Sequence, residues 1–392
     1  MDAEPVLGCR FVDKSRQPYW ERKKDLDREG RVDIAEVNDA MQAALEYMVK
    51  PIDPCDGPQV QARLFRAKRD TLCLKINHMV ADAGGVKEYI YLLSSIYRQL
   101  EKDPSYIPEV NSAGSRSRMQ VVQHFIFWDK VKIVRRSFRD WKEAYFPVGN
   151  WSVPLQHLTQ SQKTYVIRKI ELQQFRVVRQ YCKKYGVTVN DIMMAAYVRS
   201  LYKMLQPSPE IPLRLSTTVD LRQHFLGGKG EAICNLSGKF AINIGMKPGS
   251  NLAEAILIVH SKMKERKNDC FGLGDCHHFI FNLSFLPFPW TCKLAGLWDN
   301  FMQRISPRPP PPVFTNLGKL DNAQVSFGEV TIQHAFLTAL ATCPPLFLMS
   351  LSGFQETLTM SIGFCEDAIH KEKIERFLKD ISWEINSLPC HP

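Results

Sequence analysis

The stretch that decides the fold is Thr71–Leu100, which reads TLCLKINHMVADAGGVKEYIYLLSSIYRQL. Its first six residues alternate leucines with other side chains, and this period of two predicts a β-strand over Thr71–Ile76. Val86–Leu100 instead repeats apolar side chains three and four residues apart, which predicts an amphipathic helix of about four turns. The segment between them, Asn77–Gly85, is therefore a strand-to-helix loop.

This loop carries side chains that are suited to acid–base chemistry. His78 has an imidazole, whose ordinary pKa of about 6.5 allows it to take a proton near neutral pH. Asp82 follows four residues later, where its carboxylate either fixes the ring or braces the loop. Gly84 and Gly85 allow backbone conformations that a Cβ forbids. The alternative is a structural histidine in an ordinary turn, because a bare H-x-x-x-D pattern arises often by chance.

The segment His78–Asp82 resembles the H-H-x-x-x-D-G signature of the condensation domains of peptide synthetases, and of the wider chloramphenicol-acetyltransferase-like superfamily. Two positions depart from that signature. Asn77 stands where many members have a first histidine, and Ala83 separates Asp82 from Gly84. The resemblance implies that His78 is the general base of an acyl transfer.

Further segments resemble the same superfamily in the expected order. Pro51–Phe65 is similar to a P-F-D-x-x-x-G-P lead-in followed by a strand, here Gln59–Phe65, which we expect to pair antiparallel with Thr71–Ile76. Tyr185–Leu201 is similar to a Y-G-x-T-x-N-D helix segment, and Val313–Gly318 is similar to a V-S-N-x-G strand.

The resemblance also implies partners for the loop from the second half of the chain. Leu213–Val219 reads as a strand that ends in Asp220-Leu221-Arg222, similar to a V-D-x-R element. In that superfamily an arginine of the second half pairs with the motif aspartate, so Arg222 is the candidate partner of Asp82; the alternative is a solvated strand end. The candidate substrate-binding residues are Asn77, Asn235 and Asn316.

The resemblance predicts an α/β fold made of two chloramphenicol-acetyltransferase-like halves. Each half is expected to be a mixed sheet packed with helices, with an active-site tunnel at their junction. A loss of periodicity near residue 160 divides the 392 residues into 1–160, with the H-x-x-x-D motif, and 161–392. Glu4–Phe11 resembles a segment that normally follows a first strand and helix, so we expect those elements to be missing.

Local patterns predict the remaining elements. Strands are expected over Lys163–Ile170 and Gln355–Ser361, and as buried strands within Ala335–Gly353, whose prolines make a membrane span improbable. Helices are expected over Asp33–Tyr47, Gln173–Lys184 ending at Gly186, a helix capped by Asn190, Leu252–Lys267 and Lys371–Leu388.

The net charge of +10 suggests an acidic partner. No recognised nucleic-acid fold accompanies this charge, so we do not expect nucleic acid binding. The basic run Lys130–Lys142 is either the solvated face of a helix or a surface for coenzyme A phosphates or an acidic carrier protein. The aromatic segment Phe279–Phe301 is either core or subunit contact, or a pocket for a lipophilic acceptor.

The chain has eleven cysteines, with no C-x-x-C pair and no basic-then-apolar leader. They read as reduced core thiols of a cytoplasmic protein. Cys270–His278 holds thiols and imidazoles, but its spacing fits no common zinc pattern, so no metal site is expected.

The implied reaction is acyl transfer from acyl-CoA or a carrier-bound phosphopantetheine thioester to a small-molecule hydroxyl or amine acceptor. No tightly bound cofactor is expected, and amides near Gly84 and Gly85 are the candidate donors to the oxyanion. Two alternatives stay open: a condensation-type amide or ester synthase served by a separate carrier protein, and a non-catalytic binding or regulatory relative.

Overall fold

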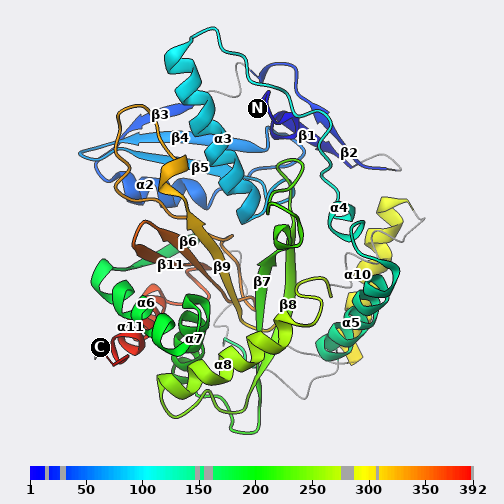
Figure 1. Cartoon of the computed structure of the whole chain (residues 1–392), viewed down its shortest axis with the longest axis vertical. Helices are drawn as coiled ribbons and strands as arrows, with labels where there is room; N and C mark the ends of the chain where they lie inside the picture. Colours follow the sequence, from blue (N-terminus) through cyan, green and yellow to red (C-terminus); the bar gives the residue numbers. More distant parts are fainter. Residues whose placement is uncertain are drawn as a thin grey trace.

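The computed structural model describes residues 1–13, 17–26, 32–145, 151–153, 162–274, 287–305 and 309–389. These residues form two lobes, each built on a mixed β-sheet with helices (Figure 1). The N-terminal lobe has the strand order β3-β4-β5, and the C-terminal lobe has the order β6-β11-β10-β9-β7-β8. The predicted fold class, two halves with a mixed sheet each, is therefore confirmed.

The centre of the N-terminal lobe is the hairpin of β4 (Val60–Arg66) and β5 (Thr71–Ile76), which pair antiparallel with Val60 opposite Ile76. The bounds of β5 are those predicted from its alternation. Two helices, α2 (Ala40–Met48) and α3 (Ala83–Lys102), cover this sheet. Cys73 packs with α2 and its neighbour Leu74 packs with α3, so the two helices lie on opposite faces of the sheet.

The predicted helix Asp33–Tyr47 is wrong in its first part. Asp33–Glu36 forms strand β3, which runs parallel to β4 and so completes the sheet. The helix α2 begins only at Ala40. Its N-cap is Asp39, whose side chain accepts hydrogen bonds from the amides of Met41 and Gln42. Apolar spacing alone did not reveal this strand, because its partners in the sheet lie on β4, 30 residues later in the chain.

The start of the chain packs beside this lobe as a single 3-10 turn, η1 (Pro5–Gly8), followed by the hairpin of β1 (Cys9–Val12) and β2 (Tyr19–Arg22). Leu7 belongs to the same buried hydrophobic cluster as Val80 of the strand-to-helix loop, so this segment supports the loop.

The C-terminal sheet is made of β6 (Lys163–Ile170), β7 (Leu213–Asp220), β8 (Ser237–Gly245), β9 (Val313–Leu320), β10 (Leu348–Phe354) and β11 (Thr357–Cys365). Strand β9 runs parallel to both β7 and β10, whereas the other neighbours are antiparallel. The predicted strands at β6, β7, β9 and β11 are thus present.

The helices that pack with this sheet are α6 (Leu172–Tyr185), α7 (Val189–Leu205), α8 (Leu252–Lys267) and α11 (Lys371–Asn386). Helix α7 lies between α8 and α11 and is buried along most of its length, as predicted. Its N-cap is Thr188, which forms a capping box with Asp191, and not the predicted Asn190. Gly186 ends α6 with a φ of 66°, as predicted.

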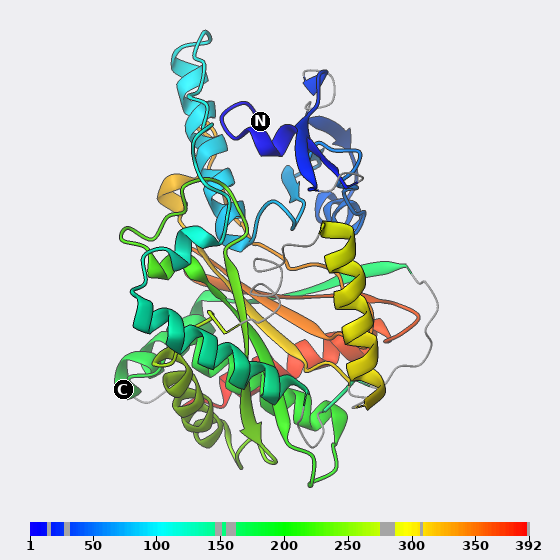
Figure 2. The same ribbon diagram turned by 90° about the vertical axis from the view of Figure 1, so that its right-hand side faces the viewer.

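The remaining elements are the helices α4 (Met119–Val122), α5 (Phe127–Tyr145) and α10 (Phe288–Ile305) and the 3-10 turns η2 (Leu221–His224) and η3 (Asn322–Gln324). Figure 2 shows α5 and α10 on one outer side of the molecule. Although α5 precedes residue 160, its Arg136 forms an ion pair with Asp269 of the C-terminal lobe at 2.9 Å. The boundary near residue 160 stays a prediction.

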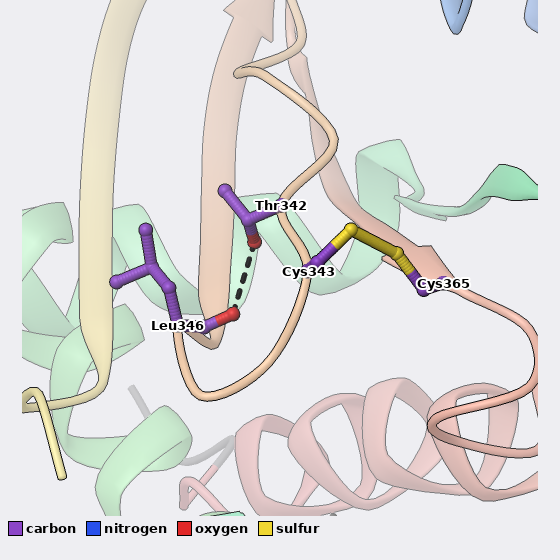
Figure 3. Close-up of a disulfide and its surroundings, with 4 residues drawn as sticks. All are labelled: Thr342, Cys343, Leu346 and Cys365. Carbon is purple, nitrogen blue, oxygen red and sulfur yellow. Dashed lines mark hydrogen bonds between the residues drawn. A yellow bond between two sulfur atoms is a disulfide. The ribbon is translucent and has the colours of Figure 1, made fainter. Parts of the chain in front are cut away.

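The prediction that all cysteines are reduced is wrong for two of them. Cys343 forms a disulfide with Cys365, the last residue of β11 (Figure 3). The turn that follows Cys343 is closed by a hydrogen bond of 3.1 Å from the Thr342 hydroxyl to the Leu346 carbonyl oxygen. No local pattern indicates this pair, because the two cysteines are 22 residues apart and only the fold brings them together.

The apolar run Ala335–Gly353 is strand only in its second part, where β10 begins at Leu348. Before that, the amides of Leu337 and Ala339 donate to the hydroxyls of Ser352 and Ser350 on β10. These side-chain acceptors replace a strand partner for the backbone. No helix within the described residues has the length and apolar character needed to cross a bilayer.

The candidate active-site loop and its arginine network

His78 lies in the loop between β5 and α3, and its side chain is exposed. Its Nδ1 atom is 3.0 Å from the carbonyl oxygen of Ala81. Because a carbonyl oxygen can only accept, this hydrogen bond requires the proton on Nδ1, and in the neutral ring the lone pair is then on Nε2. Within the described residues no hydrogen bond to Nε2 is present. The loop therefore presents a histidine in the tautomer that a general base requires.

Asn77 gives the loop its shape. Its side-chain oxygen accepts from the Met79 amide at 2.9 Å, and its nitrogen donates to the Ile52 carbonyl at 3.2 Å. The structure thus places this residue next to His78 but uses its side chain to hold the backbone. A contact with substrate stays a prediction.

Asp82 connects the loop to both lobes. Its Oδ1 accepts from the Gly85 amide at 2.8 Å, so that Asp82 caps α3, and its Oδ2 accepts from the Leu236 amide at 2.8 Å. Arg222 donates to both oxygens from Nη1, at 2.9 and 3.0 Å. Of the two predicted roles, Asp82 therefore braces the loop and does not hold the imidazole ring.

The predicted contact between Arg222 and Asp82 is present, and it belongs to a larger network. From η2, Arg222 also donates to Glu88 at 3.0 Å, to Asp220 at 3.1 Å and to the Cys234 carbonyl at 2.9 Å. The arginine is 3% exposed. Burial by itself lowers the pKa of its guanidinium, but the carboxylates of Asp82, Glu88 and Asp220 outweigh burial and raise it. Arg222 therefore stays charged.

Glu88 is the member of this network that the sequence did not reveal. It lies four residues after Gly84 on α3, so both face the same side of the helix, toward Arg222. Burial raises the pKa of the Glu88 carboxyl, and the nearby guanidinium of Arg222 partly offsets that rise. The sequence signal that could have identified Glu88 is its position as a polar residue on the face of α3 that is directed toward Asp82.

Gly84 and Gly85 are needed for close packing and not for an unusual backbone conformation, which corrects the prediction. A Cβ on Gly84 would lie 2.5 Å from Nη1 of Arg222, and one on Gly85 would lie 2.8 Å from the Cys234 carbonyl oxygen. Neither glycine has a positive φ. The Gly85 amide already donates to Asp82, so it is not the oxyanion donor that we expected there.

Asn235 and Asn316 have different surroundings. Asn235 donates to the backbone carbonyl of His78 at 2.9 Å, so a residue of the C-terminal lobe directly holds the backbone of His78. Asn316 lies on β9, where its side chain donates to Asn190 at 3.2 Å and accepts from the Gly318 amide at 3.0 Å. Among the described residues, Asn316 makes no hydrogen bond to the His78 loop. For both asparagines a role in substrate binding stays a prediction.

A cavity of about 420 Å³ lies elsewhere between the lobes, lined by α2, β6 and β11 and including Tyr165, Lys169 and His334. In the C-terminal sheet, three strand spacings separate β11 from β7, which is roughly 14 Å. The Asp82 network joins the sheet at the β7 end, so this cavity is separate from the His78 loop.

The candidate metal segment Cys270–His278 falls partly outside the described residues. Among the residues that are described, no three His, Cys, Asp or Glu side chains gather as a metal-binding group.

No family model matches the sequence, and a search of curated proteins finds no significant match. Solved structures do match it over nearly its whole length. The first condensation domain of the CDA synthetase is 14% identical, with a TM-score of 0.65, over 99% of this chain and 85% of that one. The chain has the two-lobed condensation-domain fold.

Two further structures with this condensation fold extend the comparison. Polyketide synthase associated protein 5 from Mycobacterium tuberculosis is 16% identical, with a TM-score of 0.62, over 99% of this chain and 88% of that one. The epimerization domain from the third module of tyrocidine synthetase B is 14% identical, with a TM-score of 0.62, over 98% and 85%. At these identities the likeness establishes the fold, as the superfamily resemblance predicted.

Proposed function

We propose that this protein is an acyltransferase that moves an acyl group from a thioester to a hydroxyl or amine acceptor, with His78 as the general base. The observation that carries this proposal is the exposed His78 ring, whose Nδ1 is held by the Ala81 carbonyl at 3.0 Å. An exposed base with a defined tautomer is available to an incoming acceptor. A histidine sealed in the core would not be.

In the proposed reaction, Nε2 of His78 takes the proton from the acceptor as its oxygen or nitrogen forms a bond to the thioester carbon. The carbon–sulfur bond of the resulting tetrahedral intermediate then breaks, and the imidazolium returns the proton to the departing thiolate. Proton transfer by a positioned base contributes about 10²–10⁴-fold to such rates. The remaining acceleration comes from holding donor and acceptor together.

The Arg222 network supports this chemistry through position. His78 is attached on one side to β5 and on the other to Asp82, and the carboxylate of Asp82 is fixed by Arg222. Asn235 of the C-terminal lobe holds the backbone of His78 itself. Contacts from both lobes thus set the position of His78. A reaction at the junction of the lobes requires a base that is fixed relative to both.

Two thioester donors fit the proposal: acyl-CoA and an acyl group on the phosphopantetheine arm of a carrier protein. The second is supported by the condensation domain of the CDA synthetase and the epimerization domain of tyrocidine synthetase B, which share the fold. The net charge of +10 suits either the phosphates of coenzyme A or an acidic carrier.

Thiol release tests the proposal. The purified chain is supplied with a panel of acyl-CoAs, or with acyl-loaded carrier protein, together with alcohol and amine acceptors. We expect acceptor-dependent thiol release that falls by about 10²–10⁴-fold in His78→Ala. His370→Ala is the matched control, because His370 is also exposed and its side chain makes no capping hydrogen bond.

The donor that supports turnover decides between the two forms of the proposal. Turnover with acyl-CoA assigns a free-standing acyltransferase, and turnover only with the loaded carrier assigns a condensation-type synthase. Equal background release by the wild type and His78→Ala with every donor would refute acyl transfer and leave a binding or regulatory role for this fold.

A further inference from the structure

Helix α5 turns a largely polar side toward the protein body. The side that faces the protein body carries Ile133, Arg136, Ser137 and Asp140, and the first three of these are buried. Arg136 pairs with Asp269 at 2.9 Å, and Asp140 accepts from Arg266 at 3.0 Å. A surface helix normally turns its apolar stripe toward the core, whereas the inner side of α5 buries one apolar residue, Ile133, and is otherwise held by these ion pairs.

Most of the apolar stripe of α5 faces solvent: Phe127, Val134 and Phe138 are exposed, whereas Val131 and Trp141 are half-buried. Its members, Phe127, Val131, Val134, Phe138 and Trp141, are spaced three and four residues apart and so share one face. Phe127 is 69% exposed and Phe138 is 64% exposed. Basic side chains flank this stripe: Lys130, Lys132, Arg135, Arg139 and Lys142 are all exposed. The predicted solvated face of a basic helix is thus present but also carries aromatic rings, and Arg136 is the exception to it.

Helix α10 repeats this arrangement. Thr291 is buried, whereas a row of large apolar side chains is exposed, namely Trp290, Leu294, Leu297, Trp298 and Phe301. Trp290 is 60% exposed and Leu297 is 57% exposed. A place in the core, one of the interpretations of this aromatic segment, is therefore wrong for α10, whereas subunit contact and an acceptor pocket stay predictions. The earlier part of the segment, 279–286, lies outside the described residues.

The two exposed rows meet. The rings of Trp141 on α5 and Trp298 on α10 stack with centroids 6.5 Å apart, so the rows form one apolar face on one side of the protein, where Figure 2 shows both helices. An exposed apolar face of this kind marks an interaction site. We call this set of residues on α5 and α10 the aromatic face.

We propose that the aromatic face docks on the surface of a lipid bilayer that contains anionic lipids. Phenylalanine, tryptophan and leucine side chains beside lysine and arginine are the composition of helices that lie in the plane of a membrane interface. The apolar rings enter the acyl boundary while the flanking cations reach the lipid phosphates. The charge of +10 adds a long-range attraction to a negative surface. The buried ion pairs of α5 keep the helix fixed to the protein while its apolar side is inserted.

The location of the aromatic face relates it to the His78 loop. The short helix α4 directly precedes α5, and its Val121 packs with Cys234 and Leu236. Leu236 donates its amide to Asp82, and Cys234 accepts from Arg222. A docked membrane would therefore lie beside the element that borders the candidate active-site loop. This docking does not depend on the proposed acyl transfer.

Vesicle flotation with the full chain tests the proposal. The probes are vesicles of phosphatidylcholine alone and of phosphatidylcholine mixed with phosphatidylglycerol. We expect the protein to float with the mixed vesicles, to bind the neutral ones more weakly, and to show a blue shift of tryptophan emission when bound. Added salt should weaken binding to the mixed vesicles.

Two double variants test the two parts of the face. Phe138→Ser with Leu297→Ser should lower partitioning by at least roughly tenfold, because two apolar side chains no longer enter the bilayer. Lys130→Glu with Arg135→Glu should lower binding to the mixed vesicles by at least roughly tenfold. Leu257→Ser with Trp383→Ser and Lys264→Glu with Lys267→Glu are the matched controls, because these side chains are exposed on α8 and α11. Circular dichroism and thermal melting confirm that each variant folds.

Failure of the wild type to float with mixed vesicles would overturn the proposal. So would equal binding by the aromatic-face variants and their controls. If the wild type is a dimer by sedimentation, and Phe138→Ser with Leu297→Ser makes it monomeric without changing vesicle binding, the face joins two copies of the chain and the proposal is wrong.

Discussion

The guanidinium of Arg222 and the carboxylate of Asp82 form a bifurcated contact, with Nη1 at 2.9 and 3.0 Å from the two oxygens, across 140 residues of sequence. Both side chains are only 4% exposed. The contact joins the helix start after His78 to the end of β7, so it fixes the two lobes relative to each other at the candidate base. A buried pair of this kind is more sensitive to loss of one partner than to loss of both.

Removing one partner of this pair should therefore be costly. We expect Arg222→Ala or Asp82→Asn to lower the free energy of unfolding by about 3–5 kcal/mol, because the partner is left charged and buried. Urea titration followed by circular dichroism measures this. The exposed pair Lys203 and Asp380, at 3.0 Å, is the control, and Lys203→Ala should cost less than about 1 kcal/mol. A cost for Arg222→Ala as small as the control's would show that water reaches the site.

The space at Gly84 gives a second prediction. Alanine in place of glycine normally stabilises a helix by about 1 kcal/mol. At Gly84 the added Cβ would lie 2.5 Å from Arg222 and displace it, so Gly84→Ala should destabilise the protein. Gly296 in α10 has no atom within 4 Å of the same position, so Gly296→Ala should stabilise it. Opposite signs of the two changes in urea titrations are the expected result, and equal signs would contradict the packing described.

The disulfide gives a third prediction. Linking Cys343 to Cys365 closes a loop over a separation of 22 residues, which stabilises the folded state by roughly 3 kcal/mol. A reductant should lower the urea midpoint of the wild type and leave that of Cys343→Ser unchanged. Cys55→Ser, at an exposed free cysteine, should respond to reductant like the wild type. A wild type that is insensitive to reductant would rule out the disulfide.

Lys75 on β5 gives a prediction of pH dependence. Burial lowers the pKa of this lysine from 10.5 to about 8, with Arg63 and Lys50 acting in the same direction and Cys73 against it. Between these two values the unfolded chain keeps a proton that the folded chain has released. Unfolding then takes up a proton, so the stability of the wild type rises with pH through this window.

The comparison that isolates this effect is between the wild type and Lys75→Gln from about pH 7 to 10.5. The wild type should gain free energy of unfolding relative to Lys75→Gln as the pH rises above about 8. Lys264→Gln, at an exposed lysine, should show no such difference. Parallel pH curves for the wild type and Lys75→Gln would contradict the lowered pKa.

The sequence by itself determined the elements whose signals are local. The alternation of Thr71–Ile76 and the three-and-four spacing after it located β5 and α3, because side-chain periodicity follows directly from backbone geometry. The order of short motifs predicted two lobes of the condensation fold and named Arg222 as the partner of Asp82.

Only the tertiary structure decided features that depend on partners distant in the chain. Asp33–Glu36 is a strand because it pairs with β4. Glu88 belongs to the same network as Asp82 because Arg222 of η2 donates a hydrogen bond to Glu88 on α3. The stripe of α5 has an ordinary amphipathic pattern, yet its direction was set by the ion pairs of Arg136 with Asp269 and of Asp140 with Arg266. Periodicity states that a helix has an apolar face. What that face meets is fixed by contacts across more than a hundred residues, which no local pattern records.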